Sequence, residues 1–394
     1  MRWLWNFMCL LLCCGLRCAQ AQAETELELN QTTPLLAAGS WRQARRRNSL
    51  ADSCSTNDGA TGTCLTRFKC MRQGGTVNGY CGTYGVCCET NMACGSSTRL
   101  KRTIIRNPAT FSSDICQYTI EAYNNNVQQL RIDFEQFELP PPTESSTDER
   151  QLECVDALEV GNFKLCGLNS GQHLYLPFNV ASGIDQLTLT FSLPTRSQQS
   201  SWRLIVTQLE APQASNKRKQ SSFNGVNGLQ DLRNIFASHH ADYELLAPSG
   251  CQQYYTELSG NIRSFNYRPN MESTYLPDTS YTICIKSIPS ASMIEYSFSK
   301  FAMSLQVGEG EGYDAACHST VHTPGRQEDY LLIPQSLLAK NTAYQPTYYC
   351  GSNDNLVVYA SPPYMMHFSS DELTLVPSME TGFSLNYRLR SSLL

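Results

Sequence analysis

Cysteine is the residue type with the clearest chemistry in this chain, and its spacing predicts disulfide bonds. Of the 18 cysteines, 14 follow residue 18, and they fall into three blocks with an even number in each. An even count lets each block close its own bonds, and such bonds persist in oxidising compartments outside the cytosol. The dense first block holds Cys54, Cys64, Cys70, Cys81, Cys87 and Cys88, and the two sparse blocks hold Cys94, Cys116, Cys154 and Cys166, then Cys251, Cys284, Cys317 and Cys350.

Zinc binding is the alternative role for the cysteines of the dense block, and their spacing does not favour it. Structural zinc sites use cysteine pairs two to four residues apart, often with histidine. Here the gaps are nine, five, ten and five residues, and no histidine lies between Cys54 and Cys88. A segment of about 35 residues buries too little surface to fold unaided, so we expect a disulfide-stapled knot over residues 54–88.

Residues for catalysis are not arranged in any pattern that we can identify. A serine hydrolase needs a serine nucleophile, a histidine base and an acid, but neither Gly-Asp-Ser-Gly-Gly nor Ala-Ala-His-Cys occurs. His318 and His322 would share one face of a helix. Because proline and glycine flank that segment, we interpret them as surface histidines rather than a zinc site. The sequence therefore predicts that the protein is not an enzyme.

The N-terminus predicts a secreted protein. Arg2 precedes an apolar run that ends at Leu16, and small residues then offer a cleavage site, so residues 1–23 resemble a secretory signal peptide. That run is too short to span a bilayer, and no later stretch is apolar enough. The net charge of −5 becomes −7 when Arg2 and Arg17 are removed, and a mildly acidic chain does not indicate nucleic acid as a partner.

Residues 24–53 form a leader that carries two modification signals. Asn30 begins Asn-Gln-Thr, the only Asn-x-Ser/Thr sequence in the chain, so we expect a glycan there. Arg42–Arg47 contains four arginines, and this run is either a convertase cleavage site or a solvated basic linker.

The elements that must position the sparse cysteines are β-strands. Apolar and polar residues alternate in Leu130–Phe134, Leu187–Phe191, Tyr281–Lys286 and Phe383–Tyr387, as expected for strands with one buried face. Residues 211–249 are polar and are predicted to be a linker between two β regions at 94–210 and 250–390. Both regions contain Cys-Gly, at Cys166 and Cys350, so they look like a diverged tandem repeat.

These features resemble CUB domains, the antiparallel jelly-roll sandwiches of extracellular proteins. The matching motifs are Phe-x-x-Phe at Phe134 and Phe298, Leu165-Cys166-Gly167, and the ending Gly382–Tyr387. The six-cysteine knot is similar to the clip-type modules of arthropod proteins. The chain as a whole resembles insect proteins built as signal peptide, knot, CUB and CUB, which implies an all-β fold with two CUB sandwiches behind a small knot, the second CUB copy being diverged.

The resemblance also implies how the cysteines pair. CUB precedent implies the bonds 94–116 and 154–166 in the first copy, and 251–284 and 317–350 in the second. The clip likeness implies that the first cysteine of the knot bonds the fifth, the second the fourth, and the third the sixth.

Many CUB domains hold calcium through a glutamate and two aspartates, and hard oxygen ligands suit that ion. In the first copy only Asp156 matches, because Pro140 and Pro194 fall where the other carboxylates belong. In the second copy Asp329 and Asp371 match, whereas Ser304 takes the glutamate position. No other cofactor is expected. Calcium is therefore a hypothesis for the second copy alone, and the alternative is that both aspartates cap turns by accepting backbone hydrogen bonds.

Tyrosine is the one hint of a binding surface. Fourteen of the 20 tyrosines follow Cys251, and tyrosine is enriched in interface hot spots. Tyrosine is also enriched in β-strands, which explains its frequency here equally well. The candidate binding residues are Tyr348, Tyr349 and Tyr364.

Three function classes follow from the sequence. The favoured one is a secreted, non-catalytic binding protein that recognises an extracellular protein or glycan through its CUB domains. The alternative is a non-catalytic regulator or cofactor of an extracellular serine-protease cascade, suggested by the clip-like knot and the arginine run. An unrecognised enzyme is the third.

Overall fold

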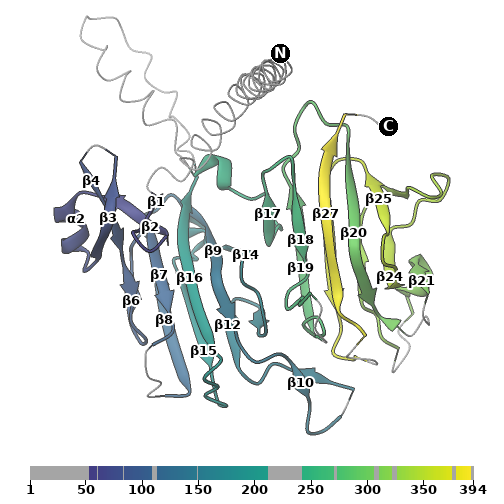
Figure 1. The fold of residues 1–394 in the computed structure, drawn as a ribbon, viewed down its shortest axis with the longest axis horizontal. Coiled ribbons are helices and arrows are strands. Elements are labelled where there is room, and N and C mark those ends of the chain that lie inside the picture. Colours follow the sequence, from purple (N-terminus) through teal and green to yellow (C-terminus); the bar gives the residue numbers. More distant parts are fainter. Residues whose placement is uncertain are drawn as a thin grey trace, which may run out of the picture. The chain divides into compact units, whose positions relative to one another are not determined.

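The computed structural model describes residues 53–391, apart from 60, 83, 109–112, 149, 212–241, 270–272, 306–309, 322–325 and 375–378. Nearly all of its regular structure is β, and its sheets are sandwich-like, so the all-β prediction is confirmed. The strands fall into a knot at residues 53–89, a first β region at 91–210 and a second β region at 250–390 (Figure 1).

The knot combines one small sheet with a helix of six residues. Strand β4 pairs with β2 and β3 in antiparallel fashion, and the sheet order is β1-β2-β4-β3. The helix begins after Thr66, whose hydroxyl accepts a hydrogen bond from the Lys69 amide, and Cys70 is its only buried residue. Six residues are too few for sequence periodicity to reveal a helix. The elements are β1 (Ser53–Ser55), β2 (Thr61–Leu65), α2 (Arg67–Arg72), β3 (Thr76–Cys81) and β4 (Gly85–Glu89).

The first β region contains two five-stranded sheets. One has the order β14-β9-β16-β7-β5 and the other β13-β12-β15-β8-β6. The strands of the first sheet are β5 (Asn91–Met92), β7 (Arg102–Arg106), β9 (Val127–Glu138), β14 (His173–Pro177) and β16 (Ser201–Glu210). Those of the second are β6 (Ser97–Thr98), β8 (Ile115–Glu121), β12 (Ala157–Val160), β13 (Phe163–Leu165) and β15 (Gln186–Ser192). A two-stranded sheet of β10 (Thr143–Glu144) and β11 (Leu152–Glu153) and the 3-10 turn η1 (Val180–Ser182) complete the region.

The alternation of apolar and polar residues explains why these strands form a sandwich. Leu130, Ile132 and Phe134 on β9 are fully buried while Arg131 and Asp133 face the other side of the sheet. Between the sheets the ring of Phe191 stacks on Trp202 at 4.1 Å. The core therefore forms from the inward faces of both sheets.

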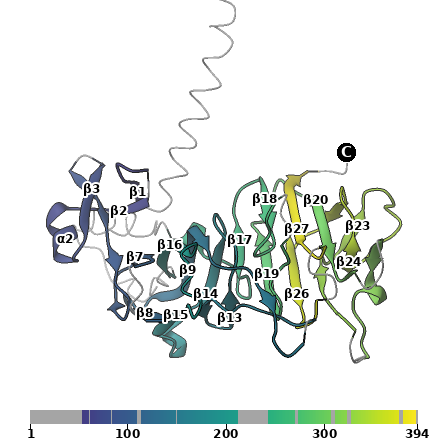
Figure 2. The same ribbon diagram turned by 60° about the horizontal axis from the view of Figure 1, so that its bottom comes forward.

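The second β region is one continuous set of 11 hydrogen-bonded strands. Strand β27 lies between β18 and β20, as Figures 1 and 2 show. The strands are β17 (Gln253–Tyr255), β18 (Ser259–Arg263), β19 (Thr279–Ile285), β20 (Met293–Met303), β21 (Glu311–Tyr313), β22 (Tyr330–Leu332), β23 (Ser336–Leu338), β24 (Tyr348–Ser352), β25 (Val357–Ala360), β26 (Met365–Ser370) and β27 (Gly382–Arg390), with the 3-10 turn η4 (Asp314–Ala316) after β21.

The end of the predicted linker is packed rather than extended. The 3-10 turn η2 (Tyr243–Leu245) is followed by Ala247, whose backbone N–H and C=O both bond the side-chain amide of Gln129 on β9. This pairing ties residues 245–247 to the first β region. Residues 212–241 of the linker lie outside the described residues.

Candidate binding site

Seven disulfides join the described cysteines, and each one stays within its own block. In the knot Cys54 bonds Cys87, Cys64 bonds Cys81 and Cys70 bonds Cys88, the order that the clip likeness implies. The β regions hold the bonds 94–116, 154–166, 251–284 and 317–350, as CUB precedent implies. Because all 14 cysteines within the described residues are paired, none of these is left as a nucleophile or metal ligand.

The two candidate calcium aspartates accept hydrogen bonds from the protein itself. Asp329 is fully buried, and its carboxylate accepts bonds from Tyr275 Oη at 2.5 Å, Gln327 Nε2 at 2.6 Å and the Asp371 amide at 2.6 Å. The Asp371 carboxylate accepts bonds from the amides of Glu328 at 2.7 Å and Leu373 at 2.8 Å.

Burial raises the pKa of Asp329 well above its ordinary value, and the nearby charge of Asp371 adds to the effect. The donor set thus fits internal hydrogen bonding better than calcium coordination. Among the described residues, no three His, Cys, Asp or Glu side chains are placed to hold a metal ion. Calcium at Asp329 and Asp371 stays a prediction, and calorimetric titration with millimolar calcium tests it.

Asp156, the single candidate carboxylate of the first β region, is likewise engaged. It is buried, and it accepts bonds from the amide of Thr195 at 3.0 Å and from its hydroxyl at 2.6 Å. These bonds fasten the loop after β15 to the start of β12.

Two of the three candidate binding tyrosines are interior residues, so that prediction is wrong for them. Tyr349 is buried beside Ser336, with which its hydroxyl shares a hydrogen bond of 2.6 Å. Tyr364 is also buried, and its hydroxyl donates to the Ala291 carbonyl at 3.0 Å. Both fill the core of the second β region, where tyrosine's β propensity accounts for them.

Tyr348 alone of the three is partly exposed, and it belongs to a surface aromatic cluster of His318, Tyr330 and Tyr348. The His318 ring stacks on Tyr348 with centroids 5.0 Å apart, and Tyr330 meets Tyr348 edge-on at 5.1 Å. All three side chains are half-buried. They present fixed rings to solvent, and partly exposed aromatics of this kind favour protein contacts.

Three sets of bonds hold the residues of this cluster in place. Strands β22 and β24 pair Leu332 with Tyr348, which sets Tyr330 near Tyr348. The 317–350 disulfide anchors the residue before His318 to β24. The Asp314 carboxylate accepts hydrogen bonds from the amides of Thr347 and Tyr348, which holds the entry to the strand. The rings are therefore preorganised, which lowers the entropic cost of binding.

Sequence reasoning assigned His318 no role beyond surface exposure, and only the fold brings it to Tyr348. His318 Nδ1 lies 3.3 Å from Glu328 Oε2. His322 lies outside the described residues, so its relation to His318 stays a prediction.

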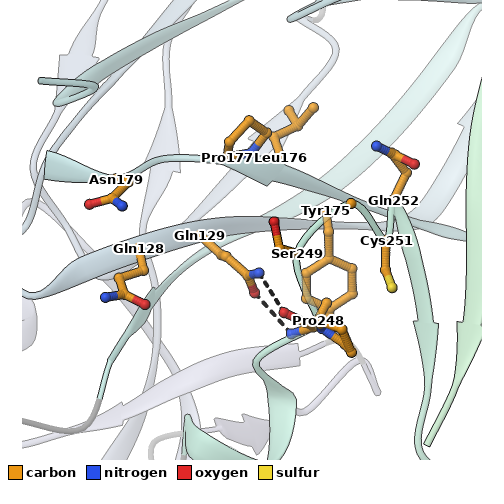
Figure 3. A pocket seen from close by; sticks show the side chains of 12 residues that line it. Gln128, Gln129, Tyr175, Leu176, Pro177, Asn179, Pro248, Ser249, Cys251 and Gln252 are labelled. Atoms are coloured by element: carbon orange, nitrogen blue, oxygen red, sulfur yellow. Dashed lines mark hydrogen bonds between the residues drawn. The ribbon is translucent and has the colours of Figure 1, made fainter. Parts of the chain in front are cut away.

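A cavity of about 420 Å³ lies where β9 and β14 meet residues 247–252 (Figure 3). None of its lining side chains carries a charge. Gln129 is bonded to Ala247, the Gln252 amide oxygen accepts from the Thr282 N–H, and Tyr175 Oη donates to the Leu245 carbonyl. Its polar groups mainly join neighbouring segments, and no acid–base pair faces the cavity.

Several predictions concern residues outside those that the structure describes. They are the signal peptide at 1–23 and the leader with Asn30 and Arg42–Arg47. Among the described residues, no helix is long and apolar enough to cross a membrane.

Comparison with known families finds a match for the second β region. A model of the animal CUB domain matches residues 248–390. CUB similarity indicates an extracellular module for protein interaction, and the disulfides are consistent with that location.

Solved structures give weaker likenesses. The CUB1-EGF-CUB2 domains of rat MASP-1 are 15% identical with a TM-score of 0.23, and the match covers 74% of this chain and 99% of that one. The same domains of human MASP-1/3 are 13% identical with a TM-score of 0.21, covering 74% and 100%. The extracellular region of zebrafish Gpr126/Adgrg6 is 13% identical with a TM-score of 0.23, covering 76% and 37%. No curated protein matches the chain.

Proposed function

We propose that this protein is a secreted, non-catalytic binding protein that recognises an extracellular protein through its second β region. The surface aromatic cluster of His318, Tyr330 and Tyr348 carries the proposal. It lies within the residues that match the animal CUB domain, and its rings pack against one another while staying half-exposed.

Two physical features support the cluster as a contact surface. Tyrosine supplies a large contact area with only two side-chain torsions to fix, so little entropy is lost on binding. Arg326 and Glu328 are partly exposed and supply a polar rim of the kind that surrounds interface hot spots.

The proposal extends to the first β region, which we infer to be a second CUB domain. Its two five-stranded sheets and its bonds 94–116 and 154–166 support this inference. Secretion is supported by seven disulfides, which form in oxidising compartments.

Partner capture from extracellular fluid tests the function. The wild-type protein is expected to capture a defined partner, and Tyr348→Ala is expected to weaken capture at least tenfold, the usual scale of a hot-spot loss. Tyr123→Ala is the matched control, because Tyr123 is an exposed tyrosine of the first β region. Equal capture by both variants would contradict the proposal, provided that both keep the seven disulfides.

The protease-cascade alternative depends on the clip-like knot and on cleavage within Arg42–Arg47. Sizing of the secreted protein after convertase treatment distinguishes the two functions. A specific cut near Arg47 favours the regulator, and an uncut chain favours the binding protein.

A further inference from the structure

The knot exposes an unusual amount of large apolar side chain for its size. Among the described residues, 12 large apolar side chains are exposed, and four of the five most exposed belong to the knot. They are Phe68 at 75%, Met71 at 66%, Tyr80 at 81% and Tyr84 at 93%. Soluble surfaces seldom gather such groups without a use for them.

Helix geometry aims two of these side chains away from the knot. Cys70 faces inward, where it bonds Cys88 and packs in the small core. With 100° per residue, Met71 and Phe68 lie 60° apart on the opposite side of α2. Tyr80 and Tyr84 flank the turn between β3 and β4, and the 64–81 disulfide ties that hairpin to the strand that leads into α2.

The exposed surface of the helix is basic. Arg67, Lys69 and Arg72 are all exposed, and the first turn of α2 has no acidic residue. Helical periodicity places Arg67 next to Met71 and Arg72 next to Phe68, so cations flank the apolar pair.

The acidic residues of the knot do not neutralise this face. Asp58 bonds Thr56 and Asn78. Glu89 is buried at the other end of the module, where Arg106 and Arg203 bind it.

We propose that the face of α2 formed by Phe68, Met71, Arg67 and Arg72, with Tyr80 and Tyr84 of the β3–β4 hairpin as further apolar contacts, docks the knot onto an anionic phospholipid surface. Protruding apolar groups can enter the acyl boundary, and flanking cations bind lipid phosphates. Tyrosine is suited to the headgroup level because it is amphipathic.

The degree of exposure favours a lipid surface over an acidic protein. Hot-spot residues of protein interfaces sit in well-packed pockets that exclude water. The four knot side chains instead project from a helix and a hairpin tip, with two thirds or more of each exposed. Three disulfides within the 35 residues from Cys54 to Cys88 hold them rigidly, so little order is gained on contact.

Vesicle sedimentation with the full secreted chain tests this proposal. We expect binding to vesicles of phosphatidylserine and phosphatidylcholine, much weaker binding to pure phosphatidylcholine, and a loss of binding as salt rises from about 0.1 M to about 1 M. Arg67→Gln and Arg72→Gln are each expected to weaken binding by about fivefold. The double variant Phe68→Ser/Met71→Ser is expected to weaken it tenfold or more.

Matched controls separate the knot face from general charge and hydrophobicity. Lys164→Gln removes an exposed cation of the first β region, and Val321→Ser removes an apolar side chain that is 70% exposed in the second. Both are expected to bind vesicles like the wild type. Equal wild-type binding to anionic and neutral vesicles overturns the proposal, as does a knot variant with wild-type binding. Binding of an acidic peptide without any binding of anionic vesicles would overturn it in favour of a protein partner.

Discussion

At the residue scale, buried polar side chains join the two β regions. His173 Nε2 accepts a hydrogen bond from the Tyr254 amide at 2.9 Å, so its imidazole must be neutral at that nitrogen. Burial lowers the pKa of His173 to about 3, and the positive charge of Arg131 contributes. Asp133 acts in the opposite direction, and the rings of Tyr175 and Tyr255 pack against the imidazole.

We predict that His173 makes the protein less stable as pH falls from about 6.5 towards 3. Its folded pKa lies below the unfolded value, so the unfolded chain binds the extra proton in this window, and the stabilisation present above pH 6.5 is lost. The contribution changes by at most about 1.4 kcal/mol per pH unit. His173→Gln keeps an acceptor for Tyr254 but cannot titrate.

Denaturant unfolding of both proteins at several pH values measures this effect. The stability gap between wild type and His173→Gln should shrink as pH falls, because only the wild type loses the His173 contribution. A gap that stays constant between pH 7 and pH 4 would refute the assignment.

Gly167 is a second residue on which the junction depends. Its φ is +70°, and a Cβ there would lie 1.8 Å from Asn266 Oδ1. That amide cannot move away without loss, because it accepts from the Leu168 amide at 3.0 Å and donates to the Thr274 carbonyl at 2.7 Å.

We predict that Gly167→Ala destabilises the fold by at least about 2 kcal/mol more than Gly171→Ala. Gly171 also has a positive φ, of 81°, but no atom lies within 4 Å of its added Cβ. The control therefore reports backbone strain alone, about 1–2 kcal/mol. Equal free energies of unfolding for the two variants would show that the Asn266 side chain can move aside at no cost in stability.

At the element scale, the knot connects to the first β region through β4 and β5. Thr90 alone separates the two strands, and β5 pairs with β7 in parallel. Glu89, the last residue of β4, is buried between Arg106 at 2.8 Å and Arg203 at 3.1 Å. Arg203 also binds Glu135 on β9. These ion pairs attach the knot to the sheet.

We predict that Arg203→Ala lowers the free energy of unfolding by about 3 kcal/mol, because a buried carboxylate loses a partner. It should also speed proteolysis near Glu89. Arg99→Ala removes the exposed pair with Glu121 and should cost far less, because solvent screens exposed charges. Chemical denaturation and limited proteolysis measure both effects, and equal losses would contradict the role given to Glu89.

At the scale of the whole molecule, one hydrophobic core runs through both β regions. Phe134 of the first region lies 6.4 Å from Phe265 of the second, which packs against Tyr281 at 4.8 Å. Gln172 donates to the Ser264 carbonyl and accepts from Gln253. A shared core of this kind couples the unfolding of its parts.

We therefore predict a single cooperative thermal transition for residues of both β regions. Phe265→Ala should lower stability by about 3–5 kcal/mol and speed hydrogen exchange in β9 as well as β19. Calorimetry and exchange mass spectrometry measure this. Two resolved transitions, or faster exchange in β19 alone, would show that the regions unfold separately.

The sequence predicted much of this fold because its signals are local. The cysteine blocks marked the three modules, and alternation in segments such as Leu130–Phe134 marked strands. The 3-10 turn η2 and the contacts of Ala247 were not predicted. The predicted linker has a polar composition, and composition alone does not distinguish a packed segment from an unpacked one.

By itself, the sequence determined that the chain is β-rich and that each cysteine block could close on itself, because residue type and spacing are enough for both. Only the tertiary structure decided which tyrosines reach the surface. Neighbouring residues of a strand face opposite sides, so the side chains of Tyr348 and Tyr349 lie on opposite faces of β24. Which side is covered depends on the sheet that packs against it, and that contact comes from residues distant in the chain.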